Sequence, residues 1–350
     1  KTKDEFPDGI SPYGADALRF CFCALASTGR DINFDLKRIE GYRNFCNKLW
    51  NASRFVFLST NNYEFNNKIN FDELTTYEKY IIIKLDELVT EYKRYCTSYR
   101  FDLMANSLYS FIWNEYCDWY LEIAKIEIEK GNEYTKNVLI YILQIILKLC
   151  HPIIPYITEE IWKEMIKLNY TNDAILMNAK FPSQQKVFKD ESISNEIELL
   201  KKFINVIRKT RSDLNVHPKT RIDIYCIFSQ DIYKEFLNDN KEVISNLIRS
   251  NNIYLNQASY DINECITVSV DELKLYIPIK KIIDIDVERE RLTKNLNNLV
   301  NNLNKIESKL NNKSFIERAP SEIIQSNFNK QKYFLKEIDS LKELLNYLSD

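Results

Sequence analysis

The chain has 350 residues, of which 45% are hydrophobic and 28% are charged, and this composition is typical of a folded globular protein rather than a disordered chain. The formal net charge is only −2, so a polyanion would have to bind local clusters of cations and not the protein as a whole. With only five glycines and eight prolines, the sequence favours long helices over turn-rich sheets.

The first half of the chain shows the spacing of amphipathic helices, because hydrophobic residues recur at every third or fourth position. Residues 1–35 carry turn signals and a short predicted helix at about Asp16–Ala26. Longer helices are predicted at about 36–58, 73–98, 102–129 and 133–150, and another short one ends near residue 168. Consecutive amphipathic helices with short links predict an antiparallel helical bundle.

The pattern changes after Phe181-Pro182. A helix is predicted at about 192–214, a strand at Arg221–Phe228 and a second helix at 232–249. Further strands are predicted near 252–256, 265–270 and 273–279. Alternating hydrophobic residues in short runs, next to helical segments, predict a small α/β module.

The last part of the chain carries two heptad patterns. The first seam contains Leu292, Leu296, Leu299, Leu303, Ile306 and Leu310; the second contains Ile324, Asn327, Gln331, Phe334, Ile338, Leu341, Leu345 and Leu348. Two heptad helices with a short link predict an antiparallel coiled-coil hairpin. The expected fold is therefore mainly α, with a connector over 1–35, a helical bundle over 36–190, an α/β module over 191–281 and a coiled-coil arm over 282–350.

Three segments concentrate positive charge. Residues 36–57 hold five cations against one acid, residues 201–222 hold seven against one, and residues 291–336 hold nine against three. Three basic segments on a nearly neutral protein indicate an extended polyanion that is contacted at separate places. The alternative is that these lysines and arginines only solvate helix surfaces.

The predicted helix at 36–58 places an aromatic ring among polar side chains. Winding it at about 100° per residue puts Phe55 in the same stripe as Lys48, Asn51 and Arg54. A ring beside amides and cations is how proteins hold an unstacked base. The alternative is that another element covers Phe55, and helical geometry alone favours that alternative.

The eight cysteines predict neither a metal site nor disulfides. The sequence contains no C-x-x-C pair, so a structural zinc site is not expected. Most of the cysteines fall on hydrophobic helix positions, as expected in a reducing compartment. With no signal peptide or long apolar run in the sequence, we expect a cytoplasmic protein that does not enter a membrane.

Several motifs of the chain resemble one known family. They are Gly14-Ala-Asp-Ala-Leu-Arg19, Ala26-Ser-Thr-Gly-Arg-Asp-Ile32, the stretch from Glu40 to Phe55, Tyr99-Arg-Phe-Asp102, the stretch from Trp113 to Glu122, and Phe315-Ile-Glu-Arg-Ala-Pro320. Together they are similar to valyl-tRNA synthetases just after the catalytic domain. A further motif, from His151 to Trp162, is shared more widely among class I aminoacyl-tRNA synthetases.

The resemblance implies specific roles for this chain. It implies a helical anticodon-binding domain, a small α/β module and an arm that binds the tRNA elbow. In the family, the helix matching residues 47–55 lines the anticodon site. Carried over residue by residue, Phe55 would stack on an anticodon base, Asn51 and Arg54 would contact base edges or phosphate, and Lys48 would contact phosphate.

For the arm, the family places basic side chains against the corner of the tRNA. The candidates in this sequence are Lys309, Lys313 and Arg318. The arm is rich in asparagine and its charges are distributed differently from the family pattern, so that pattern does not fix which of the cations make the contact. Arg318 has a structural alternative, in which it fixes the turn through backbone carbonyls.

The catalytic signatures of class I synthetases do not occur in this sequence. Its only two histidines are His151 and His217, each followed by proline, and neither belongs to a nucleotide-binding motif. The resemblance implies that ATP, valine and editing sites lie upstream, in a longer enzyme. We therefore expect a catalytically inactive portion without cofactor or metal, whose partners are tRNA(Val) and the upstream catalytic and editing domains, in a monomeric enzyme.

Two alternatives remain from the sequence. One is the same region of an isoleucyl or leucyl relative, although the heptad arm and the lack of C-x-x-C pairs argue against the isoleucyl enzyme. The other is a free-standing helical scaffold or tRNA-binding protein. Sequence upstream of Lys1 would distinguish a portion of a synthetase from a free-standing protein.

Overall fold

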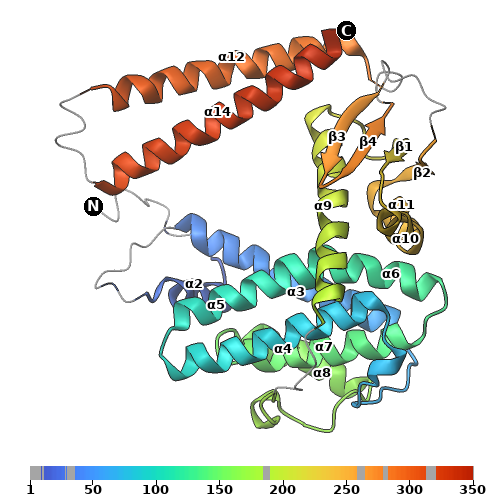
Figure 1. Cartoon of the computed structure of the whole chain (residues 1–350). Coiled ribbons are helices and arrows are strands. Elements are labelled where there is room, and N and C mark those ends of the chain that lie inside the picture. Colours follow the sequence, from blue (N-terminus) through green and yellow to red (C-terminus); the bar gives the residue numbers. More distant parts are fainter. Residues whose placement is uncertain are drawn as a thin grey trace. The chain divides into compact units, whose positions relative to one another are not determined.

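The computed structural model describes residues 9, 12–27, 29, 36–183, 190–257, 265–278, 283–312 and 321–349 (Figure 1). The chain forms two compact units, Lys1–Ile197 and Glu198–Asp350. The division falls within helix α9 (Glu191–Asp213). The first unit is helical, and the second combines a small sheet with a long helical hairpin.

Unit 1 is a bundle whose helices lie close to the predicted ranges. It contains α2 (Ala15–Leu25), α3 (Leu36–Ser59), α4 (Thr76–Thr97), α5 (Phe101–Ser110), the π-helical segment η2 (Phe111–Tyr120), α6 (Leu121–Glu129), α7 (Tyr134–Cys150) and α8 (Pro155–Lys167), with 3₁₀ turns η1 (Phe71–Glu73) and η3 (Leu176–Asn178). Helix α7 is hydrophobic on nearly every side, and it is buried accordingly in the core of the bundle.

Local sequence explains where two of these helices start. Thr75 and Glu78 form a capping box at the start of α4: the Thr75 hydroxyl accepts from the Glu78 N–H, and the Glu78 carboxylate accepts from the Thr75 N–H at 2.8 Å. Pro155 occupies the first turn of α8, where its missing N–H costs no hydrogen bond. These residues fix the entry points of the helices around the core.

The predicted helix over 102–129 is continuous but not uniform. Residues 111–120 form a π-helical segment between α5 and α6. Its wider turn keeps four large side chains buried in the core: Phe111, Ile112, Tyr116 and Tyr120. Hydrophobic spacing alone does not distinguish such a turn from an α-helix.

Unit 2 contains a four-stranded mixed sheet. Its elements are β1 (Ile222–Ile227), α10 (Asp231–Asp239), α11 (Lys241–Ile248), β2 (Ser250–Leu255), β3 (Ile266–Val270) and β4 (Leu273–Ile277). The strand order is β2-β1-β4-β3. Strands β1 and β2 pair in parallel, whereas β4 pairs antiparallel with both β1 and β3.

The prediction of one helix over 232–249 is wrong, because the chain breaks it into α10 and α11 at Asn240. The Asn240 side chain is buried and donates to the Phe236 carbonyl at 3.0 Å. Asparagine competes in this way with the backbone bonds that would continue a helix. Two short helices therefore connect the parallel strands β1 and β2.

The arm is an antiparallel pair of long helices, α12 (Ile285–Leu310) and α14 (Ser321–Ser349) (Figure 1). Near one end, Arg289 Nη2 donates to the Leu348 carbonyl at 2.6 Å, and further along Gln331 Nε2 donates to Glu307 Oε1 at 3.2 Å. The predicted seam residues Leu292, Leu303, Ile306, Leu310, Ile338 and Leu348 are buried. The Gln331 contact satisfies a polar side chain within the seam.

Candidate nucleic-acid interface

Helix α3 has one buried face and one exposed face. Its buried face contains Ile39, Phe45, Cys46, Leu49, Ala52, Ser53 and Val56. Asn47, Asn51 and Arg54 are exposed on the other side, and they recur at the spacing of one helix turn. The two amides and the guanidinium therefore form a continuous polar row that solvent can reach.

Phe55 is less exposed than the winding of α3 predicts. Its ring is half-buried and packs against the bundle core, and Lys125 Nζ of α6 lies 5.3 Å from the ring centroid. Lys125 is in turn paired with Glu122 at 2.5 Å. A neighbouring helix thus covers part of the ring, in line with the alternative that helical geometry favoured.

The exposed aromatic ring on α3 is Trp50, which is 38% exposed. It lies one turn after Asn47 and one turn before Arg54, so it belongs to the same row. Leu58, at 76% exposed, ends the row. Neither residue was among the predicted site residues, although their spacing from Asn47 and Arg54 was visible in the sequence.

Lys48 is held by two residues of the π-helical segment. Its ammonium donates to Asp118 Oδ1 and lies 3.9 Å from the centroid of the Trp113 ring. Burial raises the pKa of the neighbouring Cys117 thiol to about 12, with Lys48 opposing and Asp118 reinforcing the shift. Cys117 is therefore a protonated thiol at neutral pH, and it is not activated as a nucleophile.

Two clusters of the same composition lie along one edge of the row, because Lys48 and Phe55 are two helix turns apart on α3. Each consists of a lysine over an aromatic ring, with a carboxylate that pairs with the lysine: Lys48, Trp113 and Asp118 in one, and Lys125, Phe55 and Glu122 in the other. Cations over aromatic faces are stabilised by the ring quadrupole. Predicted residues Lys48, Asn51, Arg54 and Phe55 therefore share one surface, but of these four only Asn51 and Arg54 are exposed on it.

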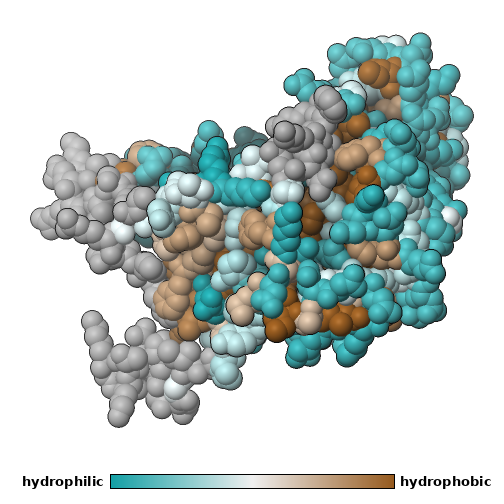
Figure 2. Space-filling view, turned by 90° about the horizontal axis from the view of Figure 1, so that it is seen from below, coloured by the Kyte–Doolittle hydropathy of each residue, from teal (hydrophilic) through white to brown (hydrophobic). Residues whose placement is uncertain are grey.

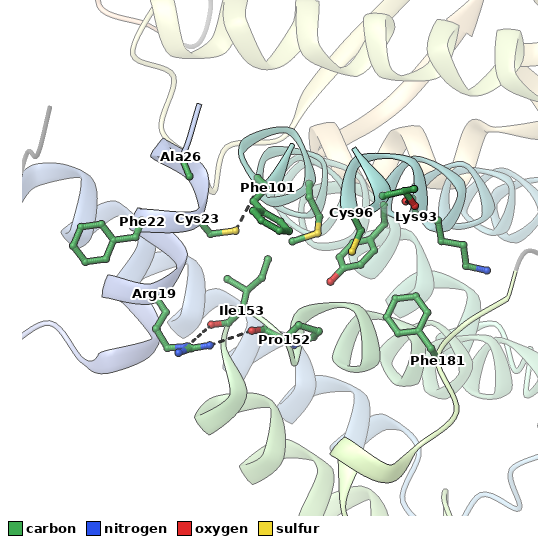
Figure 3. Close-up of a pocket in the computed structure, with 13 residues that line it drawn as sticks. Arg19, Phe22, Cys23, Ala26, Lys93, Cys96, Phe101, Pro152, Ile153 and Phe181 are labelled. Carbon is green, nitrogen blue, oxygen red and sulfur yellow. Dashed lines mark hydrogen bonds between the residues drawn. The ribbon is translucent and has the colours of Figure 1, made fainter. Parts of the chain in front are cut away.

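Two of the motifs that carry the family resemblance contact each other. Asp16 accepts hydrogen bonds from the N–H groups of Tyr156, at 3.4 Å, and Ile157, at 2.7 Å, and it thereby caps α8. Arg19 donates to the carbonyls of Ile153 and Pro152, at 2.8 and 3.1 Å (Figure 3). These residues connect α2 to the turn before α8, which is a structural role.

His151 belongs to the same turn and is also engaged. Its Nδ1 lies 2.9 Å from the Thr158 hydroxyl, which itself donates to the Ile154 carbonyl at 2.8 Å. The histidine is therefore satisfied within the fold.

A groove of about 830 Å³ lies beside this turn in unit 1. Phe22, Phe101 and Phe181 line it, together with Cys23 and Cys96 (Figure 3). Burial raises the pKa of the Cys23 thiol to about 11, so this cysteine is not activated as a nucleophile. Other hydrophobic patches are visible between hydrophilic side chains in Figure 2.

The cations of residues 201–222 are largely used inside unit 2. Arg208 donates to the Leu247 carbonyl, and Arg211 donates to the carbonyls of Ile248, His217 and Thr220. Leu247 and Ile248 end helix α11, whose last carbonyls lack partners within the helix. The charge of this segment therefore reflects a structural task, and it is weak support for a polyanion contact.

The arm retains exposed cations. Lys309, a predicted elbow residue, is exposed near the end of α12, as is Lys305 one turn earlier. The other two candidates, Lys313 and Arg318, lie outside the described residues. Arg291, at the opposite end, pairs with Glu288 and donates to the Asp213 carbonyl.

Within the described ranges, no cluster of His, Cys, Asp or Glu has the arrangement of a metal site. Over the same ranges, none of the helices combines the length and hydrophobicity that a membrane crossing requires.

Comparison with known families defines the class of these domains. Residues 78–226 match the family described as the anticodon-binding domain of tRNA ligase. The chain therefore contains a tRNA-ligase anticodon-binding domain. The matched range begins in α4, so the exposed row of α3 precedes it.

The arm and the relatives identify the particular family. Residues 284–349 match the valyl tRNA synthetase tRNA binding arm. Valine–tRNA ligases of Buchnera aphidicola (subspecies Schizaphis graminum) and Legionella pneumophila (strain Lens) are each 38% identical, over 100% and 94% of this chain and 37% and 36% of their own lengths. That of Xanthomonas campestris is 35% identical over 98% of this chain and 37% of its own length. The chain belongs to the valyl-tRNA synthetase family, and it matches the C-terminal portion of these relatives.

The chain spans little more than a third of the length of these curated relatives, at 36–37%. A solved ternary complex of LeuRS with tRNA and LeuAMS from Agrobacterium radiobacter K84 aligns with 69% of this chain and 28% of that chain. Its identity is 14% and its TM-score is 0.38, which is too low to establish a common fold.

Proposed function

We propose that this chain is the tRNA-recognition portion of a valine–tRNA ligase that activates valine with ATP and attaches it to tRNA(Val). The relatives carry that name, and both family matches of the chain describe tRNA-binding domains. The catalytic and editing sites would lie in the part of the enzyme upstream of these residues. The chain would then bind and orient tRNA for a reaction that takes place elsewhere.

The exposed row of α3 is the proposed anticodon contact. Asn47 and Asn51 supply amide groups that can pair with base edges, and Arg54 supplies a planar cation for a base edge or a phosphate. Trp50 adds an exposed ring to the row. Stacking of a base on such a ring contributes about 1–3 kcal/mol.

In this proposal Phe55 forms one wall of the anticodon site. Because its ring is half-buried and Lys125 lies over it, a base would stack against the remaining open part of the ring or displace the ammonium. Lys48 can contact a phosphate only when its ammonium leaves Asp118. The lysines would therefore exchange a carboxylate partner for a phosphate when RNA binds.

Binding at this surface would act on the reaction from a distance. Interactions with parts of a substrate far from the reacting atoms supply binding energy that orients those atoms. The arm would add contacts at a second region of the same tRNA. Removal of an α3 contact should therefore affect tRNA-dependent steps and leave valine activation intact.

The test uses the complete ligase that contains this chain, with Phe55→Ala and Phe55→Tyr variants. Phe55→Ala should raise the KM for tRNA by about 10-fold, given the energy of one stacked base. Valine-dependent ATP–pyrophosphate exchange should stay near the wild-type rate. Phe55→Tyr keeps the ring and should retain the wild-type KM.

An equal loss in both assays would mean that Phe55 supports the fold instead, and it would overturn the anticodon role. Loss of charging with no change in the KM for tRNA would also contradict it.

A further inference from the structure

Helix α14 displays two aromatic rings outside the seam of the arm. Phe328 is 48% exposed and Tyr333 is 57% exposed. The seam between α12 and α14 is already filled by leucine, isoleucine and other heptad residues, among them the buried Leu303 and Ile306. The Tyr333 ring lies 5.7 Å from the ring of the seam residue Phe334, centroid to centroid, but about half of Tyr333 and of Phe328 stays exposed. This exposure calls for a role other than closing the hairpin.

The rings frame two lysines on the outer face of α14. At about 100° per residue, Lys332 and Lys336 lie opposite the seam, with Phe328 and Tyr333 at the two edges of the same face. Both lysines are exposed, as is Asn329. We call these five residues the outer face of α14.

Charge is distributed unevenly along the arm. Its distal part, residues 295–312 and 321–336, holds five lysines and two acids, whereas residues 285–294 and 337–349 hold four cations and six acids. No acid occurs between Ile323 and Lys336. The Gln331–Glu307 hydrogen bond places the outer face level with Lys305 and Lys309 of α12. The rings thus lie in the basic part of the hairpin.

We propose that the outer face of α14 is an RNA-contact surface, on which Phe328 and Tyr333 stack with unpaired bases and Lys332 and Lys336 bind phosphates. Exposed rings interleaved with cations at helical spacing are the combination that single-stranded RNA recognition uses. Positive charge without neighbouring acids favours a polyanion over a protein partner. The inference rests on the proposed tRNA-binding function, and it assigns the base contacts of the arm to this face.

The experiment measures binding of the full 350-residue chain to transcribed tRNA(Val) by filter binding, together with nuclease footprinting. Phe328→Ala and Tyr333→Ala should each weaken binding about 5-fold or more, the effect of losing one stacked base. Phe328→Tyr and Tyr333→Phe retain a ring and should bind like wild type. Val287→Ala, a change at a 63% exposed position of α12 outside the outer face, is the matched control and should have no effect.

Footprinting separates this inference from the proposed function. The alanine variants should lose protection of loop nucleotides outside the anticodon while anticodon protection persists. If both alanine variants bind tRNA(Val) with the affinity of the wild-type chain, the RNA contact of the outer face is overturned and the proposed function stands. No tRNA binding by the wild-type chain would overturn the proposed function itself. Sedimentation of the wild-type chain and of the alanine variants tests for self-association. If the wild-type chain self-associates through these rings and the alanine variants do not, the RNA assignment is also overturned.

Discussion

The Lys48 ammonium lies 3.9 Å from the centroid of the Trp113 ring and ends a stack of aromatic side chains that rises from the core. Trp113 stacks on Tyr109 at 5.4 Å, and Tyr109 stacks on Phe45 at 5.2 Å. Asp118 holds the ammonium in this position. The outer face of Trp113 is therefore covered by a cation that a carboxylate retains.

The pairing of Lys48 with Asp118 predicts that Asp118 weakens RNA binding. Asp118→Asn removes the competing charge and frees the ammonium for phosphate, so affinity for tRNA should rise about 2- to 5-fold at low salt, in keeping with an exposed pair worth up to about 1 kcal/mol. The slope of log affinity against log salt should steepen by about 0.7–0.9.

The matched control is Glu164→Gln, which removes another carboxylate paired with a lysine, at 2.5 Å from Lys167, on α8. It should leave tRNA affinity unchanged. Weaker binding by Asp118→Asn would instead make the carboxylate a direct contact to a base.

A second prediction concerns Arg211, whose side chain is buried and donates to the carbonyls of Ile248, His217 and Thr220. Arg211→Ala leaves these acceptors without their donor and should destabilise unit 2 by about 2–4 kcal/mol, measured by urea unfolding followed by circular dichroism. The exposed neighbour Lys209 provides the control, because Lys209→Ala should change stability by less than about 0.5 kcal/mol. Similar, small effects of both changes would argue against a structural role for the segment.

A third prediction is a pH dependence that comes from Asp102. The Arg100 guanidinium donates to both of its carboxylate oxygens, at 2.9 and 2.7 Å, and this bonding lowers the pKa of Asp102 below its usual value of 3.8. The folded state thus holds the ionised form more strongly than the unfolded state does. The pair stabilises the fold above pH 3.8, and its contribution disappears as the pH falls below 3.8 through the native pKa.

Asp102→Asn should accordingly lower the unfolding free energy at pH 7 and have a progressively smaller effect below pH 3.8. Urea unfolding at a series of pH values measures this. A loss of stability that is the same at pH 7 and at pH 2.5 would show that the side chain acts through shape rather than charge.

Regular features of the fold follow from the sequence because they depend on local spacing. The helices at 36–59 and 134–150 were predicted within a residue or two, since a 3.6-residue hydrophobic period identifies a buried face directly. The break at Asn240 and the π-helical turn at 111–120 were not predicted. Both depend on which backbone carbonyl receives a particular hydrogen bond, and hydrophobic spacing does not encode that choice.

The candidate surface could be predicted only in part from the sequence, and the reason is a different one. The row of Asn51 and Arg54 lies on one helix, so its exposure could be predicted by winding α3 alone. The contacts of Lys48 with Asp118 and of Phe55 with Lys125 join residues about 70 positions apart. Only tertiary packing shows that α6 and the π-helical segment cover the edge of the row.

The arginines of residues 201–222 also have contacts that only tertiary packing shows. Their charge is plain in the sequence, but whether a guanidinium faces solvent or a helix end depends on the position of α11 beside α9. Counting charges therefore overestimated the basic surface that this segment offers.

The role proposed for α3 is tested by measuring binding of the 350-residue chain to the anticodon stem–loop of tRNA(Val), and to the same stem–loop with a changed anticodon. The wild-type chain should bind the valine loop about 10-fold tighter or more, as expected for the loss of one or two base contacts. The double change Asn51→Ala with Arg54→Ala should abolish that preference. Both positions are exposed, so the circular dichroism spectrum of the double variant should match that of the wild-type chain. A preference that persists in the double variant would place anticodon recognition away from α3 and contradict the role proposed for Asn51 and Arg54.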